Sequence, residues 1–377
     1  MCNHWCNALS LTSPYDTFIK RPSHRMPFPS FADFRSFILT LLLGLAAAGL
    51  CIALDTPLPW MIGPLFASAA ARMAGVSLYC PNAVRQGGQW AIGTALGLYF
   101  TPLVVKVLAS YLPWIFAGTV FAMVLGLSCA WLLAWLSGVD RVTAFFAMAV
   151  GGASEMAAQG ERHGAAVDRI AAAHSLRIMM VVVLVPFTFK FLDVHGLDPF
   201  VPGARVIHTG GLLLLVALTS AGALLLSRLN WPNVWVIGPL LVATLLTAFG
   251  VNLSALPEWM THFGQLFIGI SLGTRFTPEF LHTAPRYLAS VALCALLAIL
   301  VAGGFGMLLA WGSHINPATA ILATSPGGIA EMSLTARTLN LGVPIVTAFH
   351  VIRMSVLVLT IGPLFRSLRY FQVRADA

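Results

Sequence analysis

The stretch GGASEM at residues 151–156 recurs as GGIAEM at residues 327–332, 176 residues further along the chain. Each stretch follows an apolar run and places two glycines and then a carboxylate where a hydrophobic helix would otherwise continue. Glycine permits unusual backbone dihedral angles, and Pro326 before the second motif also lacks a backbone donor. We therefore predict that a helix breaks at each motif and that a new helix begins after the glycines.

The composition places these motifs in a membrane protein. The chain is 58% hydrophobic and 9% charged, with a mean hydropathy of +0.86, whereas a soluble domain carries roughly 25% charged residues. A spanning helix needs about 20 mainly apolar residues, and these runs lack the alternation of a membrane barrel. We expect an all-α polytopic membrane protein built from ten apolar runs: Phe34–Ile52, Leu58–Ala74, Trp90–Ala109, Trp114–Leu136, Ile170–Leu192, Leu212–Leu226, Val234–Phe249, Phe263–Gly273, Leu288–Leu309 and Val346–Leu364.

The charged residues and the cysteines argue against two other classes of protein. The net charge is +8, but the basic residues lie at the ends of apolar runs, as in ordinary membrane topology. We therefore expect the lipid bilayer, and no nucleic acid, as a partner. The six cysteines show no paired metal spacing, and Cys2, His4 and Cys6 fall in an irregular polar tail, so we expect neither a metal nor a cofactor.

The chain contains an internal repeat. GQWAIGTALGLYFTP (88–102) matches GQLFIGISLGTRFTP (264–278) at 9 of 15 positions, and TPLPWMIGPL (56–65) matches WPNVWVIGPL (231–240) at 6 of 10. His174-x-x-Arg177 corresponds to His350-x-x-Arg353 at the same offset of 176. Repeats at a fixed offset indicate homologous structural units. We predict membrane repeats at residues 34–195 and 205–370, and a disordered extension at residues 1–33 whose true start is Met1 or Met26.

The positions of lysine and arginine favour inverted repeats. These residues precede the odd-numbered helices in the first half and follow them in the second half. About five crossings per repeat, with the glycine-broken segment not counted, place fourteen basic residues inside and four outside when both termini are cytoplasmic. The expected location is the bacterial inner membrane. The four outside are Lys106, Lys190, Arg205 and Arg337.

The predicted site lies at the two breaks. Helix N-termini attract anions, and broken helices of secondary transporters hold substrate near the membrane midplane. An arginine within a membrane helix is costly and needs a partner, for which the candidates are Glu155, Glu331 or an anionic ligand. We expect each glutamate at the third position of its new helix. The candidate substrate-binding residues are Gly151, Gly152, Ser154, Glu155, His174, Arg177, Ser325, Gly327, Gly328, Glu331, His350, Arg353, Gln89 and Gln265.

A purely structural interpretation competes with this one. The glutamates and arginines of the two halves would then form ion pairs that lock neighbouring segments together. The histidines would be hydrogen-bonded core residues, and the glycines would serve close helix packing. Gln89 and Gln265, which we place at the start of the third helix of each half, fit either interpretation.

These motifs carry a resemblance to a known family. PWMIGPL, GQWAIGTALG, GGASEMA, SPGGIAEM and the two His-x-x-Arg pairs resemble the AbrB-type membrane proteins, which are built from an internal duplication. That family carries two labels, membrane regulator of gene expression and ammonia monooxygenase. The broken inverted repeat is also similar in architecture to the cation–proton antiporters and the anion and bile-acid symporters. The resemblance covers about Phe34 to Arg369.

Three functions follow from these features. The first is a secondary transporter or exporter of a small anionic molecule, coupled to a proton through Glu155 or Glu331, or to sodium. The second is an oxygenase, but the intramembrane histidines are one per half and each has an arginine three residues on, which would repel a metal. The third is a regulator of gene expression, which would act indirectly because the sequence has no soluble output domain. Transport is the function we favour over an enzyme, and a homo-oligomer remains open.

Overall fold

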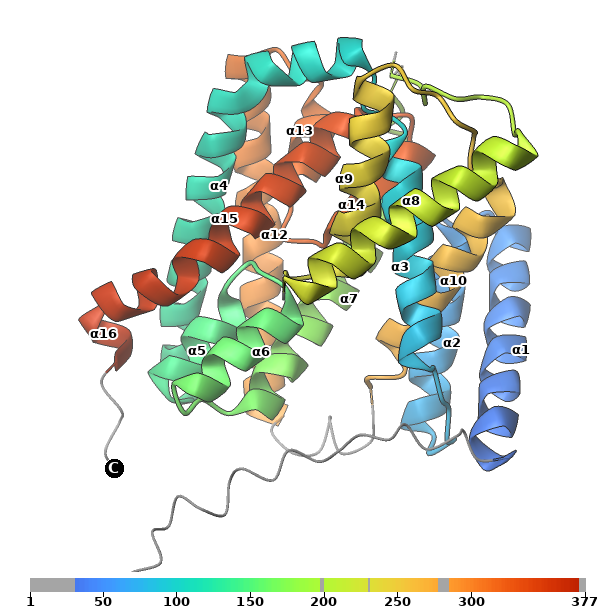
Figure 1. Ribbon diagram of the computed structural model, residues 1–377. Coiled ribbons are helices and arrows are strands. Elements are labelled where there is room, and N and C mark those ends of the chain that lie inside the picture. Colours follow the sequence, from blue (N-terminus) through green and yellow to red (C-terminus); the bar gives the residue numbers. More distant parts are fainter. Residues whose placement is uncertain (1–30, 197–199, 230, 277–284, 373–377) are drawn as a thin grey trace, which may run out of the picture.

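The computed structural model describes residues 31–196, 200–229, 231–276 and 285–372 (Figure 1). The described residues are helical with connecting loops and turns. Residues 1–30 lie outside the described part, and with them most of the predicted N-terminal extension. The first helix begins at Phe31, three residues inside that predicted extension.

The described part of the first half contributes seven helices. Two of them, α5 and α6, are the two pieces of the first broken helix, and residues 149–152 separate them. The bounds are α1 (Phe31–Ala53), α2 (Pro59–Met73), α3 (Asn82–Gly97), α4 (Pro102–Ser137), α5 (Arg141–Met148), α6 (Ala153–Arg162) and α7 (Val167–Phe191).

The described part of the second half repeats this order. Helices α13 and α14 are the two pieces of the second broken helix, and residues 325–328 separate them. The bounds are α8 (Thr209–Arg228), α9 (Val234–Ala248), α10 (Glu258–Gly273), α12 (Pro285–Ser313), α13 (Pro317–Thr324), α14 (Ile329–Thr338), α15 (Val343–Ser367) and α16 (Arg369–Gln372).

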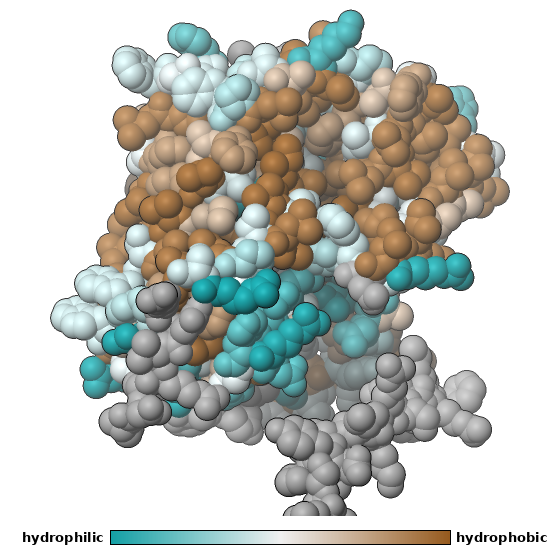
Figure 2. Space-filling view, turned by 60° about the vertical axis from the view of Figure 1, so that its left-hand side comes forward, coloured by the Kyte–Doolittle hydropathy of each residue, from teal (hydrophilic) through white to brown (hydrophobic). Residues whose placement is uncertain are grey.

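Among the described residues, six helices are long and apolar enough to span a membrane. They are Phe34–Ala53 of α1, and α4, α7, α8, α12 and α15. Large apolar side chains such as Leu42, Phe116 and Leu300 remain more than half exposed on them, as expected where lipid rather than water is the solvent. Figure 2 shows apolar side chains gathered in a broad belt on one face, with hydrophilic side chains beyond its edges. The protein is therefore a helical membrane protein.

One apolar run does not form a single helix. Within Trp90–Ala109, α3 ends at Gly97 and α4 begins at Pro102. The Thr101 hydroxyl accepts a hydrogen bond from the Val104 amide, and Pro102 occupies the first helical turn, where its missing donor costs nothing. Helix α4 has 36 residues in all and contains Pro113. Polarity alone cannot locate a cap inside an apolar run.

The helices of the two halves pack on each other in matching pairs. Helix α3 packs on α9, and its counterpart α10 packs on α2. Helices α3 and α10 also meet each other, at Gly88 and Gly264. A Cβ atom added to Gly88 would lie 2.9 Å from the Gly264 carbonyl oxygen, and one added to Gly264 would lie 2.9 Å from the Gly88 oxygen. The contact is reciprocal, because equivalent glycines of the two halves each meet the backbone of the other.

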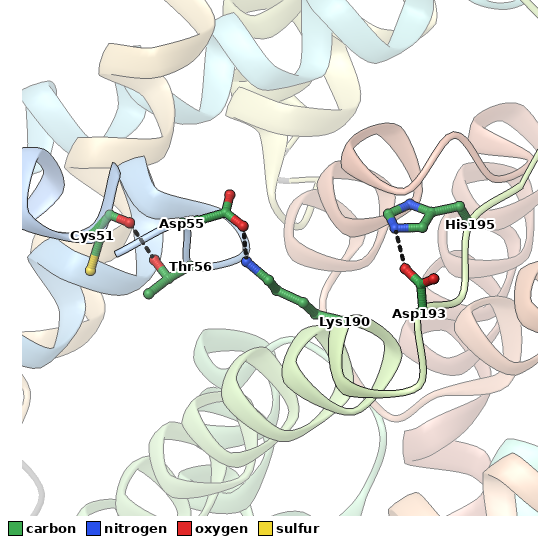
Figure 3. Close-up of polar contacts among 6 residues, drawn as sticks. All are labelled: Cys51, Asp55, Thr56, Lys190, Asp193 and His195. Atoms are coloured by element: carbon green, nitrogen blue, oxygen red, sulfur yellow. Dashed lines mark hydrogen bonds and ion pairs between the residues drawn. The ribbon is translucent and has the colours of Figure 1, made fainter. Parts of the chain in front are cut away.

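An exposed ion pair joins the segment after α1 to the last turn of α7. Lys190 Nζ, in the last turn of α7, lies 2.6 Å from Asp55 Oδ2 in the turn after α1 (Figure 3). The hydrogen bond and the charge of Lys190 lower the pKa of Asp55. A second pair, His195 Nε2 to Asp193 Oδ1 at 3.3 Å, follows α7 directly. Both pairs lie at the C-terminal end of α7 and are exposed.

Candidate functional site

Both predicted breaks are present. Helix α5 ends at Met148 and Gly152 is the N-cap residue of α6, while α13 ends at Thr324 and Gly328 is the N-cap residue of α14. Each break therefore brings the free carbonyl groups of one helix end close to the free amide groups of the next helix start. Glu155 and Glu331 occupy the third position of α6 and α14, as the spacing predicts.

The carboxylates of these glutamates lie over the glycines that begin their own helices. A Cβ atom added to Gly152 would collide with Glu155 Oε2, and one added to Gly328 would collide with Glu331 Oε2. Because the N-cap residue is a glycine in both helices, it supplies no side-chain cap. A glycine at the N-cap thus leaves room for the carboxylate beside the positive end of the helix dipole.

The intramembrane arginines bind backbone carbonyl groups at the breaks. Arg177 Nη1 donates to the oxygens of Ala149 at 3.0 Å and Met148 at 3.2 Å. Arg353 donates through Nη1 to Ser325 O at 2.8 Å and through Nη2 to Gly327 O at 2.7 Å. A cation at a helix C-terminus is stabilised by the carbonyl groups that have no partner within the helix.

This arrangement corrects one expectation from the sequence. The structure forms no ion pair between Arg177 and Glu155 or between Arg353 and Glu331, all four of which it describes. The carbonyl groups of the broken helices are the partners instead. Sequence spacing shows that a buried arginine needs a partner, but it does not show that a helix end supplies one.

Each histidine of the His-x-x-Arg pairs is fixed by two hydrogen bonds. His174 Nε2 lies 3.0 Å from Phe146 O, and His174 Nδ1 lies 3.0 Å from Arg177 Nη2. His350 repeats this with Leu322 O at 3.0 Å and Arg353 Nη2 at 2.8 Å. An arginine only donates, so Nδ1 accepts and Nε2 carries the hydrogen. Both rings are fully buried and connect the spanning helix to the half-helix before the break.

A cavity of about 590 Å³ joins the two breaks. Residues from both halves line it, among them residues of α3 and α9. His174, Ser325 and Gln265 are the predicted site residues that do not line it. The predicted residues that do are Gly151, Gly152, Ser154, Glu155, Arg177, Gly327, Gly328, Glu331, His350, Arg353 and Gln89.

The glutamines occupy positions different from those predicted. Gln89 and Gln265 lie in the middle of α3 and α10 rather than at their starts, because those helices begin at Asn82 and Glu258. Gln89 Nε2 donates to Asn233 Oδ1 at 3.3 Å, which links α3 to the start of α9 at the cavity wall. Gln265 is buried, outside the lining.

Two basic residues that the sequence analysis did not select also line the cavity. Arg85 lies in α3, and Arg275 lies just after α10. Neither forms an ion pair with a described carboxylate within 4.0 Å. The repeat contained a signal for Arg275: at the same offset the first half carries Tyr99, so this charge is not a product of the duplication. Arg85 likewise corresponds to Thr261.

The cavity is positively charged. Its described lining contains four arginines (85, 177, 275 and 353) and two glutamates (155 and 331). The side chains of Trp231, Asn233 and Trp235 add apolar surface and hydrogen-bonding groups at the start of α9. A positively charged, partly aromatic cavity of this size can hold a small anion in a membrane interior.

No group of three or more His, Cys, Asp or Glu side chains that could hold a metal ion occurs among the described residues. Cys2, His4 and Cys6 lie outside that part of the chain. Cys129 and Cys294 are buried where α4 crosses α12, with Cys129 Sγ 3.8 Å from the Cys294 carbonyl oxygen.

These features define a helical membrane protein with two broken helices around a basic cavity. The sequence pattern of the family described as "Transition state regulatory protein AbrB" matches residues 60–369, so the chain belongs to the AbrB family. It is 26% identical over 336 residues to "Putative regulator AbrB" of Escherichia coli (strain K12). The aligned region covers 86% of this chain and 93% of the relative. It is 24% identical over 360 residues to "Uncharacterized protein YhjN" of Bacillus subtilis (strain 168), with coverage of 86% and 91%. No solved structure matches the chain.

Proposed function

We propose that the protein is a secondary transporter of a small anionic molecule, which binds between the two broken helices. The observation that carries this proposal is the cavity that joins both breaks and contains Arg85 and Arg275 without a carboxylate in ion-pair contact. Arg85 is half-buried and Arg275 is exposed, and both line the cavity, so each guanidinium group is available to donate hydrogen bonds to a bound anion.

The arginines at the breaks have a different role in this proposal. Arg177 and Arg353 are engaged with helix carbonyl groups, so they stabilise the breaks. The anion would contact Arg85, Arg275 and the amide groups at the start of α6 and α14. Arg275 therefore replaces Arg353 as the residue on which we expect substrate affinity to depend most directly.

The proposed binding site between the two breaks further requires that the two halves be inverted relative to each other. In Figure 1, α4 runs from the top of the molecule downward, whereas its counterpart α12 runs upward. Helices α4 and α12 pack together. Opposite directions of equivalent helices support an inverted repeat, the arrangement in which broken helices meet near the membrane midplane.

The cavity is open beside α6 and closed beside α14. Every residue of α14 from Ile329 to Ala336 is buried, while α6 carries the exposed Ser154 and the half-buried Glu155. Ser227, which precedes Arg228, also lines the cavity. Arg85 and Arg228 belong to the predicted cytoplasmic set, so this asymmetry supports a cavity open to the cytoplasm. Cytoplasmic termini in a bacterial inner membrane stay a prediction.

Glu331 is our candidate for coupling to a proton. Its side chain is 9% exposed and lines the cavity opposite the open α6 side. A carboxylate at such a position can be protonated from the cavity and can respond to the charge of a bound anion. Sodium remains the alternative coupling ion.

The test is a comparison of small-molecule anions inside and outside cells that contain the wild-type protein or Arg275→Gln. We expect at least one anion to change its distribution with the wild-type protein, and that change to fall at least tenfold with the variant. Arg205→Gln, which removes an exposed arginine outside the cavity, is the control. Equal anion distributions in cells with the wild-type protein and in cells without it would refute transport.

The word "regulator" in the name of the E. coli relative suggests a second function. Export of a metabolite that acts as a signal would alter gene expression without a separate regulatory domain. Glu331→Gln separates the two: expression changes that persist in a variant without transport would favour a regulatory role independent of transport.

A further inference from the structure

A second cleft, of about 420 Å³, lies between the end of α6 and the last turns of α15. It is separate from the transport cavity and shares no lining residue with it. Gln159, Arg162, His163 and Arg366 form its polar part, and none of the described residues that line it is acidic. The polar part of the cleft therefore carries positive charge.

His163 is held in a fixed position beside this cleft. Its Nδ1 atom lies 2.8 Å from Gln159 O, which leaves Nε2 as the ring nitrogen for another partner. The ring stacks on Phe146 with centroids 5.6 Å apart, and meets the edge of Phe365 at 4.7 Å. Packing against two aromatic rings fixes the imidazole orientation, so the cleft has one preorganised polar side chain.

The opposite wall of the cleft is apolar and belongs to a spanning helix. Val358, Leu359, Gly362 and Pro363 of α15 form it, and Leu359 is 64% exposed. Helix α15 has 25 residues and is therefore about 37 Å long, longer than the hydrocarbon layer of about 30 Å. It is long enough to place its last turns and Arg366 at the layer of lipid headgroups.

We propose that this cleft binds an anionic phospholipid. The phosphate group would lie between Arg162, His163 and Arg366, and an acyl chain would lie along Leu359 and Gly362. Basic clefts between membrane helices at the headgroup level bind anionic lipids in this way. Because α6 follows the first break directly, the lipid would connect α6 to α15, which carries His350 and Arg353.

The test uses the full-length protein in detergent, with dioleoyl-phosphatidylglycerol or dioleoyl-phosphatidylcholine added at equal concentration. Native mass spectrometry counts the bound lipid, and thermal unfolding gives the midpoint shift. We expect phosphatidylglycerol to bind at least tenfold more tightly than phosphatidylcholine and to raise the midpoint more.

Two kinds of variant locate the lipid. Arg162→Gln with Arg366→Gln removes charge, and Gly362→Trp fills the cleft while keeping every charge. A Cβ atom at Gly362 meets no other atom within 4 Å, so the fold tolerates a side chain there. Both variants should lose the preference for phosphatidylglycerol, whereas Gly362→Ala and Arg228→Gln should keep it.

Several outcomes would overturn the proposal. They are equal binding of the two lipids, an undiminished preference in Gly362→Trp, and the same midpoint shift from inorganic phosphate alone. None of these depends on the proposed transport function, because the altered residues lie outside the transport cavity.

Discussion

Arg177 and Arg353 compensate the most costly feature of the fold at the scale of single residues. A helix that ends inside a membrane leaves carbonyl groups without partners, and each such group is expensive in lipid. One guanidinium, with five donors in a planar fork, binds two of these oxygens and the adjacent histidine at each break. In both arginines the Nε atom is buried without a partner.

Replacing Arg353 by Ala should destabilise the protein. The change leaves Ser325 O and Gly327 O without their donors, at a cost of about 1–3 kcal/mol for each buried acceptor. We expect a large fall in the thermal unfolding midpoint in detergent and partial recovery in Arg353→Lys. Arg337→Ala, in the last turn of α14, should leave the midpoint near that of the wild type. A stable, folded Arg353→Ala protein that has lost transport would instead place Arg353 in contact with the ligand.

The sequence predicts much of this residue-scale arrangement. An arginine in an apolar helix with a histidine three residues before it must share a face with that histidine and must have a partner. The identity of the partner depends on where the half-helices end in space, which no local pattern records. Arg85 was missed because a basic residue near the start of a helix is indistinguishable from a topology signal.

At the scale of elements, close contacts between helices hold the two halves together. The crossing of α3 and α10 brings the backbones of Gly88 and Gly264 into direct contact. Only small residues permit such an approach between membrane helices, where van der Waals packing replaces the hydrophobic effect. The Gln89 and Gln265 side chains follow these two glycines directly, so the crossing also fixes their positions.

Gly264→Leu should weaken the crossing of α3 and α10. Its Cβ atom would lie 2.9 Å from the Gly88 backbone oxygen, which cannot move away as a flexible side chain can. Overpacking of this kind costs about 1–3 kcal/mol. We expect a lower thermal midpoint. Gly304→Leu in α12, where an added Cβ atom meets nothing within 4 Å, should have little effect, and equal effects of the two changes would contradict the role of the contact.

The sequence predicts the breaks better than the helix boundaries. Paired glycines and Pro326 interrupt an apolar run in a way that composition makes visible, and both breaks occur where expected. The boundary between α3 and α4 lies inside an apolar run and depends on the Thr101 cap, which a polarity pattern does not resolve. Likewise, residues 329–336 of α14 are buried whereas α6 is partly exposed, and only the three-dimensional structure shows this difference.

At the scale of the whole molecule, equivalent helices with opposite directions would place equivalent positions on opposite sides of the membrane. The C-terminal ends of α1 and α8 provide the clearest comparison. Asp55 follows α1 and is exposed, and Arg228 is the last residue of α8 and is exposed. Parallel repeats would put both on one side, whereas inverted repeats separate them.

Cysteine labelling tests this arrangement. In a background without native cysteines, we expect Arg228→Cys to react with a membrane-impermeant maleimide from the cytoplasmic side, and Asp55→Cys and Arg205→Cys to react from the opposite side. Arg205 precedes α8, whose 20 residues extend about 30 Å, so the labels at 205 and 228 must separate if α8 spans the membrane. The label at residue 55 then decides between the two kinds of repeat. If residues 55 and 228 react from the same side, the repeats are parallel, the two breaks no longer meet as mirror images, and the proposed transport mechanism fails with them.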